Sequence, residues 1–500
     1  MYRKEDLMRC HQETIAAQGP DPDPLRFLNT NEPPSDIESS YLQLALADKL
    51  EKIGGLDAHI QEVRQQLREL LLQRWLIRHQ ADKYKTVLHP IRRIPAEVFR
   101  NIFLFCADDI RGVTPNSLDP TSTTWTIPRV SRAWRAIALS FPRLWANIHI
   151  PSTVLTIKDI KRHQIANSPY LLTVQLGRSA NYPLSVTIRC PSRVRNLALL
   201  QVLAATSGRW RIFHADLTFS SYEVLSTYIT SFPLLTEVYL NVIPDKVRAN
   251  DDSGGSDDYD ENGAVLVDII KGSAFSKVFK SCPNLKTIQV HPRYLPVMEV
   301  PFSNIETFID LAVFSSIADC IAALRLLPRL RVFDTMHQDG EELEVGEPFE
   351  PFELPHLQRL VAYGDHRGSG GSLRLLEFLI TPSLKNLTLR LLDENKSLLA
   401  FLHLQSECKI QSLELDGGNL SDMDCVQILE RTPALETLTL RCPWVFTDKF
   451  VERLMAEDGL AFVPLLKTLK CETCKGSRHE PFPEVDCLQE VRPGLHVLIS

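Results

Sequence analysis

Pro433-Ala-Leu-Glu-Thr-Leu-Thr-Leu440 carries the pattern that decides the fold of this 500-residue chain, Pro-x-Leu-x-x-Leu-x-Leu. The last two apolar residues of the pattern lie two positions apart, so a strand would point both side chains to one face. The first apolar residue lies three positions earlier, on the entering turn. Further copies begin at residues 233, 283, 328, 355, 382, 409 and 464, with a weaker one at 304. Each copy therefore predicts one short strand.

The copies recur with a regular period. Their first apolar residues are Leu235, Leu285, Ile305, Leu330, Leu357, Leu384, Ile410, Leu435 and Leu466, most of them 25 to 27 residues apart. Amphipathic stretches such as 422–430, with Ser421 as a candidate N-cap, separate the copies. A period of about 20–29 residues is typical of leucine-rich repeats. We therefore expect an α/β solenoid of strand–turn–helix units with a parallel sheet along its concave side.

The solenoid is expected to span residues 150–500. Its start is placed near residue 150, because Pro169–Leu176 and Trp210–Leu217 resemble degraded copies of the repeat. The widest gap between copies contains residues 244–263, an acidic stretch with almost nothing to bury. That composition predicts a mobile insertion.

The N-terminal part divides into a proline-rich stretch and an apolar one. Residues 1–40 contain two proline clusters, at 20–24 and 33–34, and are predicted to form a flexible leader. Residues 41–80 place apolar side chains at alternating spacings of three and four, which predicts an amphipathic helix. Gly54-Gly55 favours a break. A helical pair capping the next domain is preferred, and a dimerising coiled coil is the alternative.

Residues 88–148 have the composition of a small helical domain. Pro95 with Glu97 just behind it is a sound helix start, since proline has no N–H to leave unpaired in the first turn. Val98, Ile102 and Phe105 then fall on one face of the predicted helix, and Leu144-Trp145 closes the segment. A unit of about sixty residues is only marginally stable unless it docks on something else.

This segment resembles the F-box family. The landmarks are Ile94-Pro95-Ala96-Glu97-Val98, Ile102-Phe103, Val130-Ser131-Arg132-Ala133-Trp134-Arg135 and Leu144-Trp145, in the order of the family pattern. With a helical pair before it and leucine-rich repeats behind it, the chain is similar to the F-box proteins abundant in mushroom-forming fungi.

The resemblance implies a function and a set of partners. F-box proteins bind a Skp-type adaptor, join a cullin–RING (SCF-type) ubiquitin ligase through it, present a protein substrate and catalyse nothing themselves. Carried over by position, the residues of the adaptor-binding face or of the helices that form it are Ile94, Pro95, Val98, Ile102, Val130, Trp134 and Trp145. Residues 83–143 contain ten Lys or Arg and four acidic residues, a net charge of +6 that would favour an acidic adaptor.

One departure from the family keeps an alternative open. The family places a further apolar helix soon after Ile102-Phe103, whereas residues 106–127 contain no clear apolar stripe. The chain would then be a stand-alone leucine-rich-repeat scaffold for protein–protein interaction, without docking to a ligase.

Composition and the remaining motifs argue against other functional classes for this protein. Lys plus Arg at 55 against Asp plus Glu at 62 gives a net charge of −7, which disfavours nucleic-acid binding. There is no apolar run long enough for a membrane helix and no secretory signal pattern, so we expect a cytoplasmic or nuclear protein. Cys471, Cys474, His479 and Cys487 form the one ligand-like cluster, but their spacing is irregular for zinc. We expect no cofactor and no enzymatic activity.

Overall fold

The computed structural model describes residues 25–30, 32–107, 116–152, 162–245, 266–310, 316–335, 350–363, 374–390, 396–405, 409–416, 422–441, 448–455, 462–471, 488, 492 and 494–499. The chain divides into two compact units, Met1–Pro95 and Ala96–Ser500.

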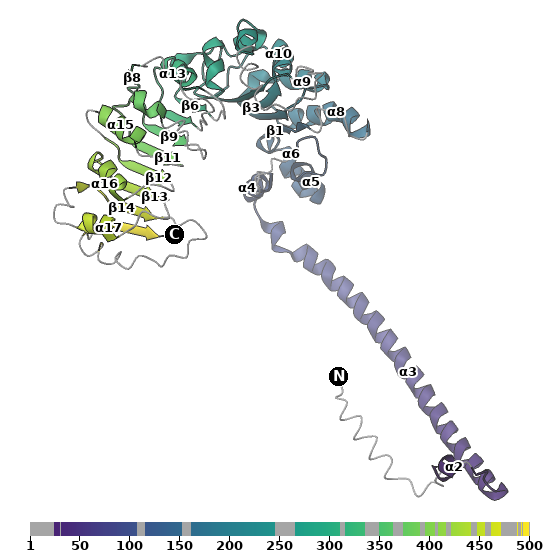
Figure 1. Cartoon of the computed structure of the whole chain (residues 1–500). Helices are drawn as coiled ribbons and strands as arrows, with labels where there is room; N and C mark the ends of the chain where they lie inside the picture. The colour runs from purple at the N-terminus through teal and green to yellow at the C-terminus, as the bar shows by residue number, and fades with distance from the viewer. Residues whose placement is uncertain are drawn as a thin grey trace, which may run out of the picture. The chain divides into compact units, whose positions relative to one another are not determined.

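The first unit is dominated by one helix, α3, which runs over 53 residues from Asp36 to Leu88 (Figure 1). A short helix, α2 (Leu25–Thr30), precedes it, and a 3₁₀ turn, η1 (Pro90–Arg93), follows it. The start of α3 is a capping box, in which the Ser35 hydroxyl accepts from the Glu38 N–H and the Glu38 carboxylate accepts from the Ser35 N–H.

Two predictions for this unit are wrong. Part of the expected leader is helical, since α2 lies within residues 1–40 and α3 begins at Asp36 rather than at residue 41; residues 1–24 and 31 lie outside the described ranges. The expected helical pair is a single helix without a buried residue. Gly54-Gly55 costs about 1 kcal/mol per glycine, but the strong helix formers on both sides carry the helix through it.

The second unit begins with three short helices. They are α4 (Ala96–Ala107), α5 (Thr123–Val130) and α6 (Arg132–Leu139), followed by the 3₁₀ turn η2 (Pro142–Trp145). All three helices contact one another. Helix α5 lies partly in the stretch that we expected to lack an apolar helix, and it buries Trp125 and Ile127. We call α4, α5, α6 and η2 the three-helix unit.

The rest of the second unit is a parallel solenoid, as the repeats predicted. Thirteen strands form one sheet in which every pairing is parallel and each strand pairs with the next one of the sheet along the chain. They are β1 (Asn147–Ile150), β2 (Leu184–Cys190), β3 (Trp210–Thr218), β4 (Glu237–Ile243), β5 (Thr287–Gln289), β6 (Thr307–Asp310), β7 (Val332–Thr335), β9 (Arg359–Tyr363), β11 (Asn386–Arg390), β12 (Ser412–Asp416), β13 (Thr437–Leu440), β14 (Thr468–Cys471) and β15 (His496–Ile499). A second, two-stranded parallel sheet joins β8 (Phe352–Glu353) to β10 (Leu379–Ile380).

Every copy of the repeat forms a strand, from β4 for the copy at residue 233 to β14 for the copy at 464. Of the two degraded copies, Trp210–Leu217 is strand β3. Pro169–Leu176 is instead part of helix α8 (Arg162–Arg178), so that prediction is wrong. The sheet starts at Asn147, slightly before residue 150. Most of the acidic insertion lies outside the described residues, and only Pro244 and Asp245 are described.

Helices and 3₁₀ turns return the chain from one strand to the next and cover the outer side of the sheet (Figure 1). They are α9 (Leu197–Ala204), η3 (Ser207–Arg209), α10 (Phe219–Tyr228), α12 (Ala274–Lys277), η4 (Pro292–Val297), η5 (Phe302–Asn304), α13 (Ile317–Arg325), η6 (Leu376–Phe378), α15 (Lys396–Leu404), α16 (Asp422–Glu430) and α17 (Asp448–Met455). Corresponding positions of successive strands, such as Phe308, Phe333 and Leu360, are aligned in register and fully buried. Stacked apolar rows of this kind form the core of the solenoid.

Candidate docking surface

Helix α4 has one buried face and one exposed apolar face. Phe99 and Phe103 are buried against the rest of the three-helix unit. Val98, Ile102 and Phe105 are spaced four and three residues apart, so they share the other face. Their side chains are 45%, 37% and 70% exposed. We call these three residues the α4 row; exposed apolar residues that share a face are a frequent mark of a protein-binding surface.

The buried face of α4 packs on Trp134 of α6. The Trp134 ring lies 5.3 Å from the Phe99 ring and 5.0 Å from the Phe103 ring, centroid to centroid. Tilted aromatic pairs at this distance contribute about 0.5–1.5 kcal/mol beyond the area that they bury. Trp134 is only partly exposed, so its first role is to hold α4 with the α4 row facing outward.

Val130 and Trp134, which belong to one landmark of the sequence, lie on two different helices. Val130 is the last residue of α5 and is 62% exposed. Ser131 then has extended backbone, and its hydroxyl accepts from the Trp134 N–H at 3.1 Å, so it is the N-cap of α6. The Arg135 guanidinium donates back to the Pro128 carbonyl at 3.0 Å, which fixes the angle between the two helices.

Of the two places predicted for Trp145, the adaptor-binding face or the structure that supports it, the side chain lies in the second. Its side chain has no exposed surface, and its indole N–H donates to the Ala138 carbonyl at 2.8 Å. The ring packs edge-on against Trp125 at 5.4 Å, and the Arg178 guanidinium lies over both rings. A large aromatic ring next to a proline turn finds more apolar contact in the core than at the surface. Trp145 therefore acts on any partner only through the helices that it supports.

Ile94 and Pro95 belong to the first unit. Pro95 is exposed and Ile94 is partly exposed, and the Ile94 N–H closes the 3₁₀ turn η1 by donating to the Ile91 carbonyl at 3.4 Å. In the second unit the structure adds Phe105 to the predicted set. The sequence signal for Phe105 is its spacing from Val98 and Ile102.

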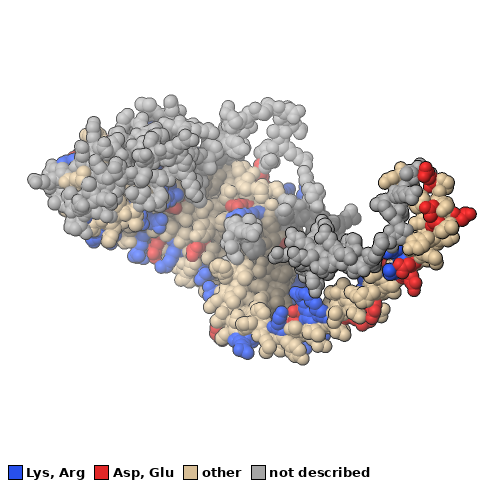
Figure 2. All heavy atoms as spheres, turned by 90° about the horizontal axis from the view of Figure 1, so that it is seen from below, with Lys and Arg blue, Asp and Glu red and all other residues tan. Residues whose placement is uncertain are grey.

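Charge in the described part of the three-helix unit is basic. Arg129, Arg132 and Arg135 are exposed close to Val130 in sequence, while the described acidic residues of the unit and of the segment that leads into α5 are Glu97 and Asp119. In Figure 2, by contrast, blue and red residues are interspersed over the face in view. A basic, partly apolar surface fits an acidic partner better than a neutral one.

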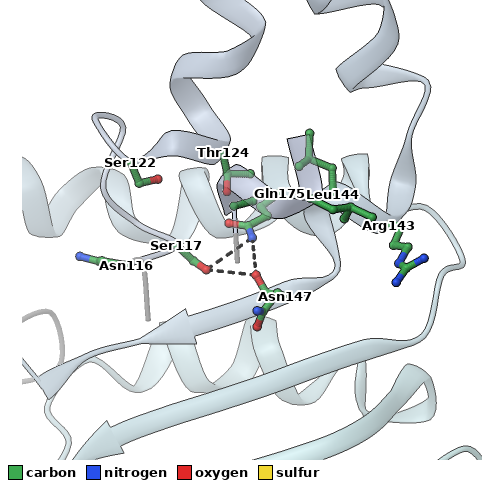
Figure 3. Close-up of a pocket in the computed structure, with 10 residues that line it drawn as sticks. Asn116, Ser117, Ser122, Thr124, Arg143, Leu144, Asn147 and Gln175 are labelled. Carbon is green, nitrogen blue, oxygen red and sulfur yellow. Dashed lines mark hydrogen bonds between the residues drawn. The ribbon is translucent and has the colours of Figure 1, made fainter. Parts of the chain in front are cut away.

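A small polar pocket lies where the three-helix unit meets the first strand (Figure 3). The Gln175 amide donates to the Asn147 carbonyl at 3.0 Å and approaches the Ser117 hydroxyl at 3.4 Å. Ser117 also exchanges hydrogen bonds with His149 of β1: its N–H donates to the His149 carbonyl at 3.0 Å, and its hydroxyl accepts from the His149 N–H at 2.8 Å. The pocket volume of about 30 Å³ is far below the roughly 300 Å³ of a small-molecule site. These bonds join the segment that leads into α5 to the first strand of the solenoid and to α8.

Along the sheet, the residue between the two buried positions of a strand points to the concave face, and several of these residues are polar. At the N-terminal end His214 stacks on Tyr239 with ring centroids 5.7 Å apart. Further along, Glu414 of β12 pairs with Arg390 of β11 at 3.7 Å and with Arg441 at 3.1 Å. Burial raises the pKa of the Asp334 carboxyl on β7, against the lowering effect of the nearby arginines Arg359 and Arg390. Aromatic and charged side chains in one concave surface suit the binding of a polypeptide.

The candidate metal cluster is described at one position only. Cys471 is buried at the end of β14, and burial raises the pKa of its thiol to about 12. Burial thus opposes the charged thiolate form that a metal ligand takes. Cys474, His479 and Cys487 lie outside the described residues. In the ranges that the structure covers, there is no group of three or more His, Cys, Asp or Glu that could hold a metal ion.

Comparison with known proteins identifies no relative by sequence. No family model matches the chain, and no curated protein sequence matches it. The fold itself is that of a leucine-rich-repeat solenoid preceded by a three-helix unit. Among solved structures, the chain is similar to one described as the crystal structure of the Rad7 and Elc1 complex in yeast, with 14% identity, 85% of this chain and 97% of that chain covered, and a TM-score of 0.29. A score this low carries no argument about partners. No helix in the described ranges has both the length and the apolar character that crossing a membrane requires.

Proposed function

We propose that this chain is a substrate-recognition adaptor of an SCF-type ubiquitin ligase. The three-helix unit would bind a Skp-type adaptor and through it a cullin scaffold, and the solenoid would bind a protein substrate. The observation that carries the proposal is the α4 row: Val98, Ile102 and Phe105 are exposed on a helix whose opposite face is packed. The F-box-like motifs of the same segment support it.

Two further observations fit this assignment. Helix α5 supplies an apolar helix that begins within the stretch where the family pattern is interrupted, and its last residue, Val130, is exposed. The arginines that follow it would favour encounter with an acidic adaptor. The proposal gives the chain itself no catalytic step, and it places the chain in the cytoplasm or nucleus, where such ligases act.

The experiment is recovery of a Skp-type adaptor by the full chain carrying Val98→Asp and Ile102→Asp together. Both positions are exposed, so the melting temperature should stay within about 2 °C of the unaltered chain. An apolar anchor in a docking interface contributes about 2 kcal/mol or more, so we expect recovery to fall at least thirtyfold.

Leu234→Asp is the matched control, because Leu234 is 41% exposed but lies in the solenoid. It should leave recovery unchanged. Equal recovery by the doubly substituted chain would contradict the docking model. If the unaltered chain recovers no adaptor at any concentration, the alternative of a stand-alone repeat scaffold is the better description.

A further inference from the structure

Helix α3 carries an apolar seam that no described residue of the first unit covers. From Leu56 onward its seam positions alternate at spacings of four and three, in the order Leu56, Ile60, Val63, Leu67, Leu70, Arg74, Ile77, Ala81, Tyr84 and Leu88. The large apolar members are between 43% and 70% exposed. This spacing, which averages 3.5 residues, is that of the a and d positions of a coiled coil. A helix of 53 residues is about 80 Å long, and the seam offers an apolar surface to a partner along much of that length.

Charge divides the same helix into two halves of opposite sign. Residues 36–62 contain six acidic residues and two lysines, a net charge of −4. Residues 63–88 contain four arginines and two lysines against Glu69 and Asp82, a net charge of +4. A second copy of this helix is therefore complementary in charge when it runs antiparallel, and it places like charges side by side when it runs parallel.

Two residues point to the same orientation. Arg74 occupies an a position, so a parallel pair would bring two guanidinium groups face to face in the seam. In a fully overlapped antiparallel pair residue 36 lies beside residue 88, which puts Arg74 beside residue 50, next to Glu51 of the acidic half. The same alignment puts Gly54 beside Leu70, and a Cβ built on Gly54 or Gly55 meets no atom within 4 Å. The glycine pair thus leaves room for the bulky side chains around residue 70.

We propose that α3 pairs with α3 of a second copy of this chain as an antiparallel coiled coil. At the glycine pair the apolar pattern contains an extra three-residue step, and such a step locally overwinds a coiled coil. The pairing would explain why two glycines lie at this point of an otherwise regular seam. The proposal concerns α3 alone and stands independently of the ligase function.

The first test is the mass of the full chain by analytical ultracentrifugation at low ionic strength. We expect twice the monomer mass of 56.7 kDa, with dissociation increasing as salt rises. Val63→Glu, Leu67→Glu and Leu70→Glu together should give a monomer with undiminished helix content. Ala58→Glu, Gln65→Glu and Leu72→Glu add the same charge on the opposite face of α3 and should leave the dimer intact. A monomeric unaltered chain at about 100 µM, or a dimer that tolerates the seam variant, would overturn the proposal.

The second test is orientation, measured as label-to-label distance between copies with one encoded spin label at Glu51 or at Lys83. The antiparallel pair gives about 35 Å for two labels at residue 51 and about 60 Å for two at residue 83, from the 1.5 Å rise per residue. A parallel pair gives short distances, about 10–20 Å, at both sites and would refute the antiparallel model. Isolation of α3 bound to a different chain in place of a second copy would refute self-association.

Discussion

The indole N–H of Trp145 donates to the Ala138 carbonyl at 2.8 Å, and this bond joins the closing turn of the three-helix unit to the last turn of α6. Both residues have no exposed surface. The motif Leu144-Trp145 is therefore a structural element of the core. It fixes the end of α6, and α6 carries the Trp134 ring that positions α4.

Trp145→Phe tests this role. Phenylalanine keeps most of the apolar contact but leaves the Ala138 carbonyl without its donor, so we expect a loss of about 1–2 kcal/mol in the free energy of unfolding. Trp145→Ala removes the ring as well and should lose about 3–5 kcal/mol. Urea unfolding followed by circular dichroism measures both. If Trp145→Phe weakens adaptor recovery without changing stability, Trp145 contacts the partner directly and the present assignment is wrong.

The sequence could predict the helical segment but not how its faces divide. Spacing alone placed Val98, Ile102 and Phe105 together, and the structure confirms that they share a face. Trp145 could not be assigned from its spacing, because an aromatic residue in a motif is equally consistent with a surface anchor and with a core residue. Its place depends on Trp125 and Arg178, which come from parts of the chain far away in sequence.

We expect acid to weaken the contact at His149 between β1 and the segment that leads into α5. Burial, followed by the charges of Arg189 and His214, lowers the pKa of its ring from 6.5 to about 4. Its Nδ1 has no hydrogen-bond partner among the described residues. The unfolded chain binds a proton at this ring below pH 6.5, and the folded chain does so only near pH 4. The stability due to the neutral ring is therefore full above pH 6.5 and is lost as the pH falls toward 4.

The expected loss at pH 5 is about 2 kcal/mol from this group alone. Unfolding by urea at pH 7 and pH 5 measures it, with His149→Gln as the non-titrating comparison. The variant should lose about 2 kcal/mol less than the unaltered chain between the two pH values. Identical pH dependence in the two proteins would show that the ring is hydrated in the folded state.

The repeat pattern predicted the solenoid well in its C-terminal part and poorly at its start. Nine copies mark nine strands because each strand buries the residues at the same two positions, which are apolar in most copies; β6 and β7 have Asp310 and Thr335 at the second position. Strand β2 lacks the leading Pro-x-Leu, and β1 follows Pro142-Arg143-Leu144 with its two buried apolar residues, Ile148 and Ile150, one position later than in the repeat. The segment Pro169–Leu176 has apolar residues at positions that satisfy both a strand and a helix, and packing beside α9 selects the helix.

The Gln405 side chain supplies hydrogen-bond partners to two backbone groups at the end of β10, and we expect it to contribute to stability. Its amide oxygen accepts from the N–H of Thr381, just after β10, at 2.8 Å, and its amide nitrogen donates to the carbonyl of Leu379 in β10 at 3.0 Å. Gln405→Ala leaves both backbone groups without these partners, so we expect a loss of about 1–3 kcal/mol. Gln201→Ala, an exposed glutamine on α9, should change stability by less than about 0.5 kcal/mol. Thermal unfolding separates the two, and equal small effects would mean that solvent replaces Gln405.

Two glycines that differ in backbone conformation should respond oppositely to the same substitution. Gly54 is helical, and the position of a Cβ there is open, so Gly54→Ala should stabilise α3 locally by up to about 1 kcal/mol. Gly272 has φ of +80° in the turn before α12, where an L side chain is strained although space is open, so Gly272→Ala should destabilise by about 1–2 kcal/mol. Amide hydrogen exchange resolves both effects, slower around residue 54 and faster around residue 272. Both substitutions are made in the monomeric chain that carries Val63→Glu, Leu67→Glu and Leu70→Glu, where no second copy of α3 lies beside Gly54. Because neither added methyl group meets an atom of the same chain within 4 Å, opposite signs would identify backbone conformation as the cause, and a shared sign would contradict it.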